Sequence, residues 1–328
     1  MSQDEAPVAL DIEQLSVMFD TPDGPLSAVN DFALEIRRGE CVGVVGESGA
    51  GKSQSFLAVM GLLAANARVS GQARLGTEPL IGRSIAELNQ FRGVKLSMIF
   101  QDPMTSLTPH MTVGEQIAES IIHHLKVSAD AARARALALL EQVQVTDAPR
   151  RLDQYPHELS GGMRQRVMIA MAIACEPRLL FADEPTTALD VTVQAQILEL
   201  ISDLRRQLNM SMVIITHDLG VVANHTDRVA VMYAGELVEL ADTKELFSRP
   251  RMPYTEALMN SIPRLDREPG SRLPSIAGST PDPTTERTSC GFASRCKYAT
   301  DKCRNEHPEL TDDGNGHLYR CFFPLGGN

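Results

Sequence analysis

The chain has 328 residues, of which 43% are hydrophobic and 22% are charged. These values are typical of a globular protein with one large domain and a smaller one. The formal net charge of −11 disfavours a nucleic-acid-binding surface, which is usually basic. The N-terminus, MSQDEAPVAL, lacks the basic start and the apolar run of a secretory signal. The longest apolar run in a helical region, residues 167–175, is about half as long as the ~18 residues that a membrane-spanning helix needs. We therefore expect any membrane role to depend on partner proteins.

In chain order, the first expected elements are two antiparallel strands at residues 10–17 and 32–36, where apolar residues partly alternate with polar ones. Continuous apolar runs then predict buried strands at residues 41–45, 96–100, 179–182 and 212–216. Helices are expected at residues 54–63, over most of 105–165, and at 193–208. Residues 228–240 are expected to form a hairpin around Ala234 and Gly235. Buried strands that alternate with helices indicate an α/β fold with a largely parallel sheet.

A glycine-rich segment, GESGAGKS at residues 46–53, lies between an expected strand and an expected helix. It matches the phosphate-binding loop, in which glycines let backbone N–H groups curl around phosphate oxygens at a helix N-terminus. In this pattern Lys52 reaches the β- and γ-phosphates, and the Ser53 hydroxyl ligates Mg²⁺. A plain glycine-rich turn before a helix is the alternative interpretation.

Two carboxylates, Asp183 and Glu184, end the apolar strand LLFADE. Asp183 is suited to face Mg²⁺, and Glu184 to polarise the attacking water as a general base. The alternative is a polar strand end that caps the next helix. The phosphate loop upstream favours the catalytic interpretation.

A second candidate anion site is the segment LSGGMRQ at residues 159–165, which precedes an almost wholly apolar helix. Ser160 with Gly161 and Gly162 at a helix start offers a hydroxyl and backbone N–H groups to an anion. A plain N-cap is the alternative. Two phosphate-binding elements in one chain suggest a nucleotide held between two subunits.

Taken together, these motifs resemble the ATP-binding cassette (ABC) ATPases over residues 8–262. Residues 46–53 match the Walker A loop, residues 179–184 match Walker B, and Ser160-Gly161-Gly162 falls on the family signature. In that fold the signature contacts the ATP held by the opposite subunit.

Four further positions match family motifs by resemblance alone. Gln101 falls on the loop glutamine that senses Mg²⁺ near the transmembrane partner, and Asp190 on the loop that crosses the dimer interface. His217 falls on the switch histidine that contacts the γ-phosphate, and Phe19 on the aromatic residue that stacks on adenine.

The resemblance thus implies a catalytic set of Glu184, His217 and Lys52, and Mg²⁺ ligation through Ser53, Gln101 and Asp183. The residues that it assigns to ATP binding are Phe19, Gly46, Glu47, Ser48, Gly49, Ala50, Gly51, Lys52, Ser53, Gln54, Gln101, Ser160, Gly161, Gly162, Asp183 and Asp190.

The implied fold is a P-loop NTPase (RecA-like) ABC ATPase core with an antiparallel β subdomain and a helical subdomain, followed by a small cysteine-bearing extension. We expect the ATPase domain at residues 8–249, with its helical subdomain at about 104–165. The C-terminal extension is expected at residues 250–328, because proline and polar residues increase after about residue 249.

Residues 97–107 (SMIFQDPMTSL), 155–172 and 182–198 are similar to one subfamily, the oligopeptide, dipeptide and nickel importers. The similarity is closest to the D-type ATPase of oligopeptide permeases. Residues 253–255 (PYT) and 262–265 (IPRL) resemble the C-terminal extension of that subfamily, although Met252 stands where it often has His.

This narrower resemblance implies a peripheral ATPase at the cytoplasmic face of the inner or plasma membrane that powers import of oligopeptides or dipeptides. The implied partners are a second ABC ATPase in a heterodimer, two transmembrane permeases and an extracytoplasmic substrate-binding protein. Import of nickel or another small solute is the alternative. A soluble ABC ATPase that acts on ribosomes or DNA is a further alternative, which the acidic balance disfavours.

Of the six cysteines, Cys41 and Cys175 lie singly in apolar segments and are expected in the core. The gaps between the other four are 5, 6 and 17 residues, unlike the short CxxC spacing of common zinc sites. In the importer subfamily, cysteines at matching positions hold a [4Fe–4S] cluster, and the resemblance implies one here on Cys290, Cys296, Cys303 and Cys321.

The cysteine segment departs from the subfamily pattern at Gly291 and Ser294, which replace prolines. Zinc held by the four thiols, or by three of them with His307 or His317, is the alternative to the cluster. Unligated thiols are a further alternative.

Overall fold

The computed structural model describes residues 7–187, 189–261, 276–285 and 287–326. The chain divides into two compact units. The first unit consists of the residues before Leu10, Ile36–Cys41 and Gly82–Ile215, and the second of Leu10–Glu35, Val42–Ile81 and Thr216–Asn328. Each unit is therefore assembled from segments that are distant in the sequence.

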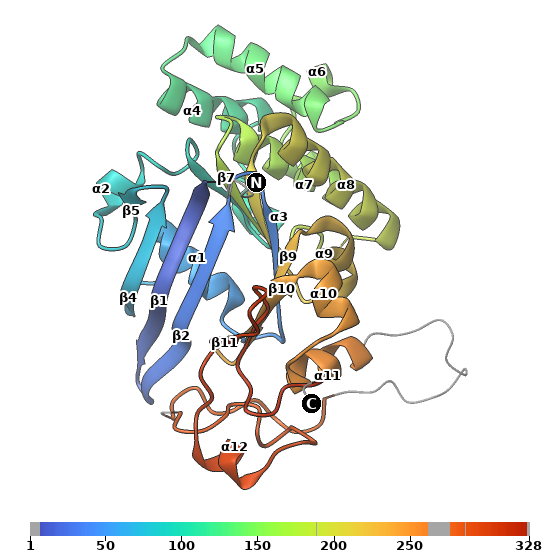
Figure 1. Ribbon diagram of the computed structural model, residues 1–328. Coiled ribbons are helices and arrows are strands. Elements are labelled where there is room, and N and C mark those ends of the chain that lie inside the picture. The colour runs from blue at the N-terminus through green and yellow to red at the C-terminus, as the bar shows by residue number, and fades with distance from the viewer. Residues whose placement is uncertain (1–6, 188, 262–275, 286, 327–328) are drawn as a thin grey trace. The chain divides into compact units, whose positions relative to one another are not determined.

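Four strands of the second unit form a sheet in the order β2-β1-β4-β5 (Figure 1). Their bounds are β1 (Val8–Thr21), β2 (Gly24–Arg37), β4 (Ala67–Leu75) and β5 (Glu78–Pro79). The β1–β4 and β4–β5 pairs are antiparallel. Along β1 the buried positions recur at Leu10, Ile12, Leu15 and Val17, and the register shifts between Glu13 and Ser16. This bulge keeps one face of the strand apolar over its whole length.

The other strands of the second unit follow the order β11-β12-β10-β9-β3. Their bounds are β3 (Cys41–Val45), β9 (Arg228–Tyr233), β10 (Glu236–Asp242), β11 (Thr311–Asp312) and β12 (Leu318–Tyr319). The β3 and β9 strands are parallel, and β9 and β10 form an antiparallel hairpin. The short β12 strand pairs with β10 and extends the sheet with residues from the C-terminal end of the chain.

Five helices of the second unit complete its described part: α1 (Lys52–Met60), α9 (Leu219–His225), α10 (Thr243–Ser248), α11 (Pro253–Ser261) and α12 (Asp301–Asn305). In an aromatic cluster, side chains from three segments of this unit pack against one another. Tyr233 of β9, Tyr254 of α11 and Phe292 of the cysteine segment have ring centroids 4.5–5.4 Å apart. All three side chains are at most 3% exposed, so the cysteine segment contributes to the hydrophobic core of the unit.

The first unit contains three parallel strands in the order β8-β7-β6. Their bounds are β6 (Leu96–Ile99), β7 (Leu179–Asp183) and β8 (Ser211–Ile215). Every residue of the three strands is buried, as expected for a parallel sheet covered on both faces.

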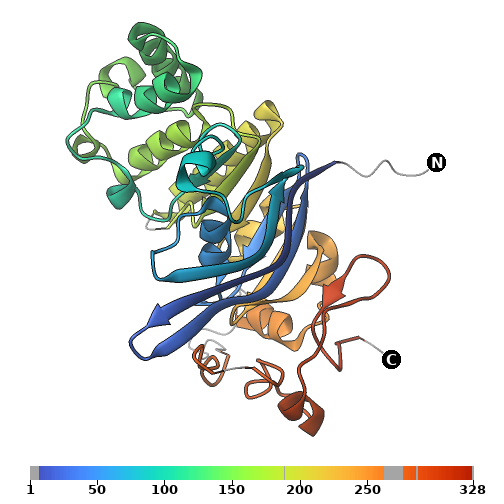
Figure 2. The ribbon, with the colours of Figure 1, turned by 90° about the vertical axis from the view of Figure 1, so that its left-hand side faces the viewer.

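Helices make up the rest of the first unit. Their bounds are α2 (Ile85–Leu88), α3 (Pro103–Ser106), α4 (Val113–Leu125), α5 (Ala129–Gln142), α6 (Ala148–Arg151), the 3₁₀ helix η1 (Pro156–Glu158), α7 (Gly161–Ile173) and α8 (Val191–Leu208). The α4 and α5 helices pack against each other and against α7, as the green helices in Figure 2 show. A capping box of Thr112 and Glu115 starts α4, and the Ser128 side chain caps α5.

The structure confirms the expected order of strands and helices and the expected α/β class. The first helix differs from the prediction for residues 54–63, because it begins at Lys52 and ends before Gly61, which has φ +65°. The β4, β5, β11 and β12 strands were not predicted. Cys41 and Cys175 are buried, as expected.

The domain boundaries at residues 249 and 250, and those of the helical subdomain, stay predictions. Residues 262–265, which carry part of the C-terminal resemblance, lie outside the described residues. No helix in the described ranges is long and apolar enough to cross a membrane.

Candidate functional site

The glycine-rich loop of the second unit runs from the end of β3 into α1. Gly46 has φ +154°, and a Cβ atom there would lie 2.1 Å from the backbone oxygen of Met232. Gly51 has φ +91°, and its Cβ would lie 2.4 Å from the backbone oxygen of Ala28. A side chain at either position would displace backbone, so the loop can adopt this path only with glycine.

Lys52 is the first residue of α1, and it is 7% exposed. Its Nζ atom donates to the carbonyl oxygens of Gly46, at 2.8 Å, and Glu47, at 2.9 Å. These hydrogen bonds close the loop around the lysine. The ammonium group is therefore already located in the loop, where it can exchange backbone carbonyls for phosphate oxygens.

The other residues of this loop differ in their exposure to solvent. Ser48 and Gly49 are exposed at its tip, Ser53 and Gln54 are half-buried in the first turn of α1, and Ala50 is buried. The exposed tip is the part of the loop that a nucleotide can approach.

Two contacts to Glu47 within the same unit were not anticipated from the sequence. Arg295, from the cysteine segment, forms a bidentate ion pair with the Glu47 carboxylate. The Tyr254 hydroxyl accepts a hydrogen bond from the Glu47 backbone N–H at 2.9 Å. The sequence carried no signal for either contact, since both partners lie more than 200 residues away.

In the first unit, the candidate general base lies at the end of β7. Glu184 has φ +44°, and its Oε2 atom accepts hydrogen bonds from Gln101 Nε2 at 3.0 Å and from Thr187 Oγ1 at 2.8 Å. Asp183, one residue earlier, is 6% exposed. Because β6 and β7 are parallel with Ile99 opposite Ala182, the residues that follow the two strands meet at one edge. The structure thus brings Gln101 and Glu184 together; Thr187 is an additional contact that sequence reasoning missed.

The candidate signature and the Asp190 loop both begin helices of the first unit. Ser160 is the N-cap of α7, and its hydroxyl accepts from the Met163 N–H at 3.4 Å. Asp190 is the N-cap of α8, and its carboxylate accepts from the Val193 N–H at 3.0 Å. Ser160 and Gly161 are exposed, and Gly162 is half-buried. The capping role, posed above as the alternative for Ser160, is therefore present; it leaves the exposed N-terminus of α7 accessible to an anion.

Two further assigned residues belong to the second unit. His217 is exposed and lies two residues after the end of β8. Phe19 lies near the end of β1, opposite Ala67 of β4, and is half-buried.

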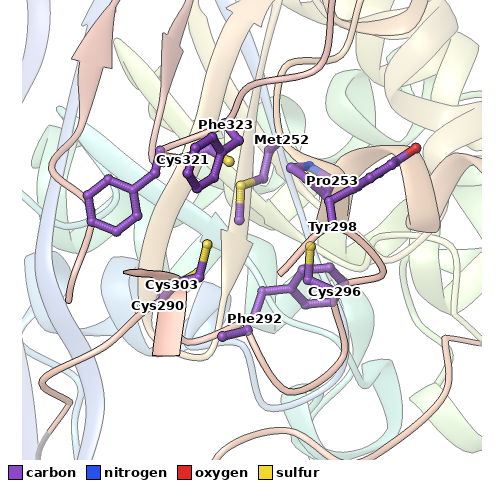
Figure 3. A pocket seen from close by; sticks show the side chains of 11 residues that line it. Met252, Pro253, Cys290, Phe292, Cys296, Tyr298, Cys303, Cys321 and Phe323 are labelled. Carbon is purple, nitrogen blue, oxygen red and sulfur yellow. The ribbon is translucent and has the colours of Figure 1, made fainter. Parts of the chain in front are cut away.

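The four C-terminal cysteines line a single cavity. They approach it from different sides, together with Met252, Pro253 and Phe292 (Figure 3). None of the six cysteines, all of which lie within the described ranges, forms a disulfide. Among the described residues, no group of three or more His, Cys, Asp or Glu side chains is arranged to hold a metal ion.

Burial raises the pKa of Cys290 and of Cys321 to about 11, and it also raises the pKa of Cys296. The neighbouring cysteines contribute to each of these increases. Without a cation the cavity therefore favours protonated thiols.

The two histidines considered as alternative ligands face carboxylates of β10. His307 Nε2 lies 3.1 and 3.2 Å from the oxygens of Glu236, and His317 Nε2 lies 2.7 Å from Glu239 Oε1. Neither histidine lines the cysteine cavity.

Comparison with known proteins gives one decisive result. The chain is 47% identical to the oligopeptide transport ATP-binding protein OppD of Escherichia coli K12 over 99% of its length and 96% of that protein. The chain belongs to the ABC transporter family. The ABC transporter model matches residues 29–187, and the model for the C-terminal region of oligopeptide/dipeptide transporters matches residues 238–303.

Other relatives of this ABC ATPase agree with the assignment. It is 47% identical to the dipeptide transport ATP-binding protein DppD of E. coli, over 96% of the chain and 97% of that protein. Among solved structures it is similar to a dimeric ATP-binding cassette with bound ADP and Pi, with a TM-score of 0.65 and 26% identity. That match covers 71% of this chain and 98% of the solved one. The cassette fold and ATP binding inferred from the motifs are confirmed.

Proposed function

We propose that this ABC ATPase powers an importer of oligopeptides or dipeptides. The observation that carries the proposal is the similarity to peptide-transport ATP-binding proteins along nearly the whole chain, including the C-terminal region. That region lies outside the part matched by the general ABC transporter model. A similarity restricted to the cassette would support an ATPase without indicating the cargo.

The residues of the two units have separate roles in the proposed reaction. Lys52 binds the β- and γ-phosphates, and the exposed tip of its loop supplies backbone N–H groups. Glu184 orients the attacking water as general base, and His217 contacts the γ-phosphate. Mg²⁺, which offsets the charge of the phosphate oxygens, is assigned to Ser53, Gln101 and Asp183.

The hydrogen bonds to Glu184 support its role as base. Two donors, from Gln101 and Thr187, share one carboxylate oxygen. The carboxylate is thereby held in one orientation before a water molecule is bound. Such prior positioning is the main protein contribution to phosphoryl transfer.

The remaining ATP-binding assignments follow the family motifs. Phe19 is proposed to stack on adenine, and Ser160, Gly161 and Gly162 to contact the ATP of an opposite subunit. Asp190 is proposed to lie at the dimer interface. The partners are a second ABC ATPase in a heterodimer, two permeases and an extracytoplasmic binding protein, with this subunit peripheral at the cytoplasmic face of the membrane.

The experiment that tests the proposal uses Glu184→Gln, which should keep ATP bound and the ATPase dimer closed. The tagged variant is incubated with ATP, native membranes are solubilised in mild detergent, and co-purifying proteins are identified. Two permeases, a second ATPase and a peptide-type binding protein are expected. Glu199→Gln, an exposed position on α8, is the matched control and should recover the same proteins, in the same amounts, as the unmodified chain.

Two outcomes contradict the proposal at different levels. Recovery of a nickel-type binding protein with permeases would change the cargo and keep the transport role. Recovery of ribosomes or DNA-processing proteins would refute transport and leave the ATPase intact.

For the cysteine cavity we propose a structural [4Fe–4S] cluster on Cys290, Cys296, Cys303 and Cys321. Its support is the family resemblance together with four free thiols on one cavity. Anaerobically purified protein should contain iron and acid-labile sulfide, and Cys321→Ser should lose both while Cys175→Ser retains them. Zinc without sulfide would refute the cluster and favour a zinc site.

A further inference from the structure

The segment between Cys290 and Cys296 also contacts the phosphate loop of its own unit. Arg295 directly precedes Cys296, and its guanidinium donates to both carboxylate oxygens of Glu47, from Nη1 to Oε2 at 2.6 Å and from Nη2 to Oε1 at 2.9 Å. The Arg295 side chain is 4% exposed. Two parallel charge-assisted hydrogen bonds fix a carboxylate in one orientation.

Arg295 is itself held in place by its other donors. Its Nε donates to the backbone oxygen of Ala277 at 3.0 Å, and Nη2 donates to that of Ile276 at 3.1 Å. Nη1 also donates to the Tyr233 hydroxyl at 3.3 Å. The hydrogen bond to Glu47 holds the pKa of Arg295 above its ordinary value. The guanidinium therefore remains a charged and immobile partner for the loop.

Every polar group of Glu47 is engaged in the second unit. Its carboxylate is held by Arg295, its N–H donates to the Tyr254 hydroxyl at 2.9 Å, and its carbonyl accepts from Lys52 Nζ at 2.9 Å. Tyr254 is fully buried. Since Lys52 is the residue that binds phosphate, the geometry of Glu47 and the location of the lysine ammonium are directly linked.

The same contacts lead back to the cysteine cavity. Residues 290–296 form a tight turn in which Ala293 N donates to Cys290 O, and Arg295 N donates to Phe292 O, both at 3.0 Å. Phe292 lines the cavity together with Cys290 and Cys296. Both thiols and the Arg295 backbone therefore belong to one hydrogen-bonded turn.

We propose that Arg295 is a positioning residue of the nucleotide site, which couples the cysteine cavity to the phosphate loop so that nucleotide affinity depends on an intact cavity. The proposal rests on the function of that loop in binding ATP. By this proposal, the C-terminal extension influences the nucleotide site of its own chain.

The charge of Glu47 explains how Arg295 would affect the affinity for nucleotide. Glu47 is a carboxylate inside a loop that receives the polyanion ATP. Arg295 neutralises it and holds both of its oxygens. Without Arg295, the carboxylate would be both mobile and repulsive to the phosphates, which would weaken binding.

The test measures binding of Mg²⁺ with a non-hydrolysable ATP analogue by calorimetry on the full chain. Arg295→Met is expected to weaken the affinity about tenfold, the scale of a typical coupling between sites. Arg295→Lys keeps the charge and loses the bidentate geometry. Its affinity for the analogue should lie between that of the unmodified chain and that of Arg295→Met. Arg304→Met is the matched control, since Arg304 is in the same extension but 57% exposed, and it should bind like the unmodified chain.

Adding the substitution Glu47→Gln to Arg295→Met distinguishes a positioning role of Arg295 from a loss of folded structure. The double variant Arg295→Met/Glu47→Gln should recover part of the lost affinity, because the repulsive charge is gone. A merely structural defect would lower the melting temperature of the nucleotide-free chain and would not be relieved by the second substitution. Affinity of Arg295→Met within about twofold of the unmodified chain, the usual error of such comparisons, overturns the proposal. A loss that Glu47→Gln does not reduce also overturns it.

The link to the cavity is tested by Cys296→Ser. This variant should weaken nucleotide binding, and combining it with Arg295→Met should weaken binding no further, because both act through one contact. Unchanged affinity in Cys296→Ser, or additive losses, would refute the coupling. The unmodified chain is measured first: if it fails to bind the analogue, the ATPase assignment fails, whereas a failure confined to the variants concerns only this inference.

Discussion

The pair His317 and Glu239 offers a sharp test of how firmly the C-terminal extension is attached to the sheet of the second unit. Glu239 lies in β10 and is 0% exposed, and His317, just before β12, is 2% exposed. His317 Nε2 contacts the Glu239 carboxylate at 2.7 Å. The same carboxylate accepts from the backbone N–H groups of Arg251, at 2.5 Å, and Met252, at 3.1 Å.

The substitution His317→Leu removes the side-chain partner and leaves the carboxylate buried. Breaking a buried pair by removing one partner typically costs about 3–5 kcal/mol. Glu239 keeps its two backbone donors, so we take the lower end, about 3 kcal/mol. That free energy corresponds to an increase of about 10²-fold in the opening equilibrium of the β10–β12 pairing.

Native-state hydrogen exchange followed on peptides that contain β12 measures this opening directly. The Arg320 N–H, which donates to the Val238 carbonyl at 2.8 Å, reports on the pairing. Exchange of these amides should accelerate about 10²-fold in His317→Leu, and stay unchanged in the control His110→Leu, where the histidine is exposed. An acceleration of less than about threefold, or under ~0.7 kcal/mol, would refute the view that this pair holds the extension in place.

Three further outcomes are expected. Glu184→Gln should lower the turnover of ATP by at least about 10²-fold and retain nucleotide binding, measured as phosphate release and analogue affinity. Asp190→Ala should lower the stability of α8 by about 1 kcal/mol through loss of its cap, seen as faster exchange of the first-turn amides. Burial acts to raise the pKa of Glu236, but the hydrogen bond from His307 and nearby positive charge lower it overall. Relative to Glu236→Gln, the unmodified chain should therefore lose melting temperature as pH falls below about 4.5, and show no such loss between pH 6 and 8.

Much of the fold could be predicted because its signals are local. The buried strands β3, β7 and β8 are continuous apolar runs, and the glycine-rich loop has its lysine and serine at fixed spacing. The β4 strand, residues 67–75, could not be predicted in this way. Only Ala73 and Leu75 are buried there, so the sequence lacks the alternation that a half-buried strand usually has. Pairing with β1 determines its conformation instead.

In the candidate nucleotide site, too, only features with a local sequence signal could be predicted. Motif spacing selected Lys52 and Glu184 as candidates, because each follows a strand or starts a helix that the sequence reveals. Gln101 was selected by the family resemblance alone. The contacts of Glu47 with Arg295 and Tyr254 join residues separated by 248 and 207 positions. Hydropathy patterns carry no information about such pairs, since they are fixed by packing of the aromatic cluster and the cysteine segment.

The discontinuous make-up of the second unit has a consequence for synthesis of the protein. Its first segments, Leu10–Glu35 and Val42–Ile81, leave the ribosome long before Thr216–Asn328 is translated, whereas the last long segment of the first unit ends at Ile215. At about 5–20 residues per second, the final segment takes on the order of ten seconds to make. During that time β3 lacks β9, its parallel neighbour, and the apolar surface of these early strands is available to chaperones or to other nascent chains. The nascent chain thus carries this uncovered apolar surface until the final segment has been made.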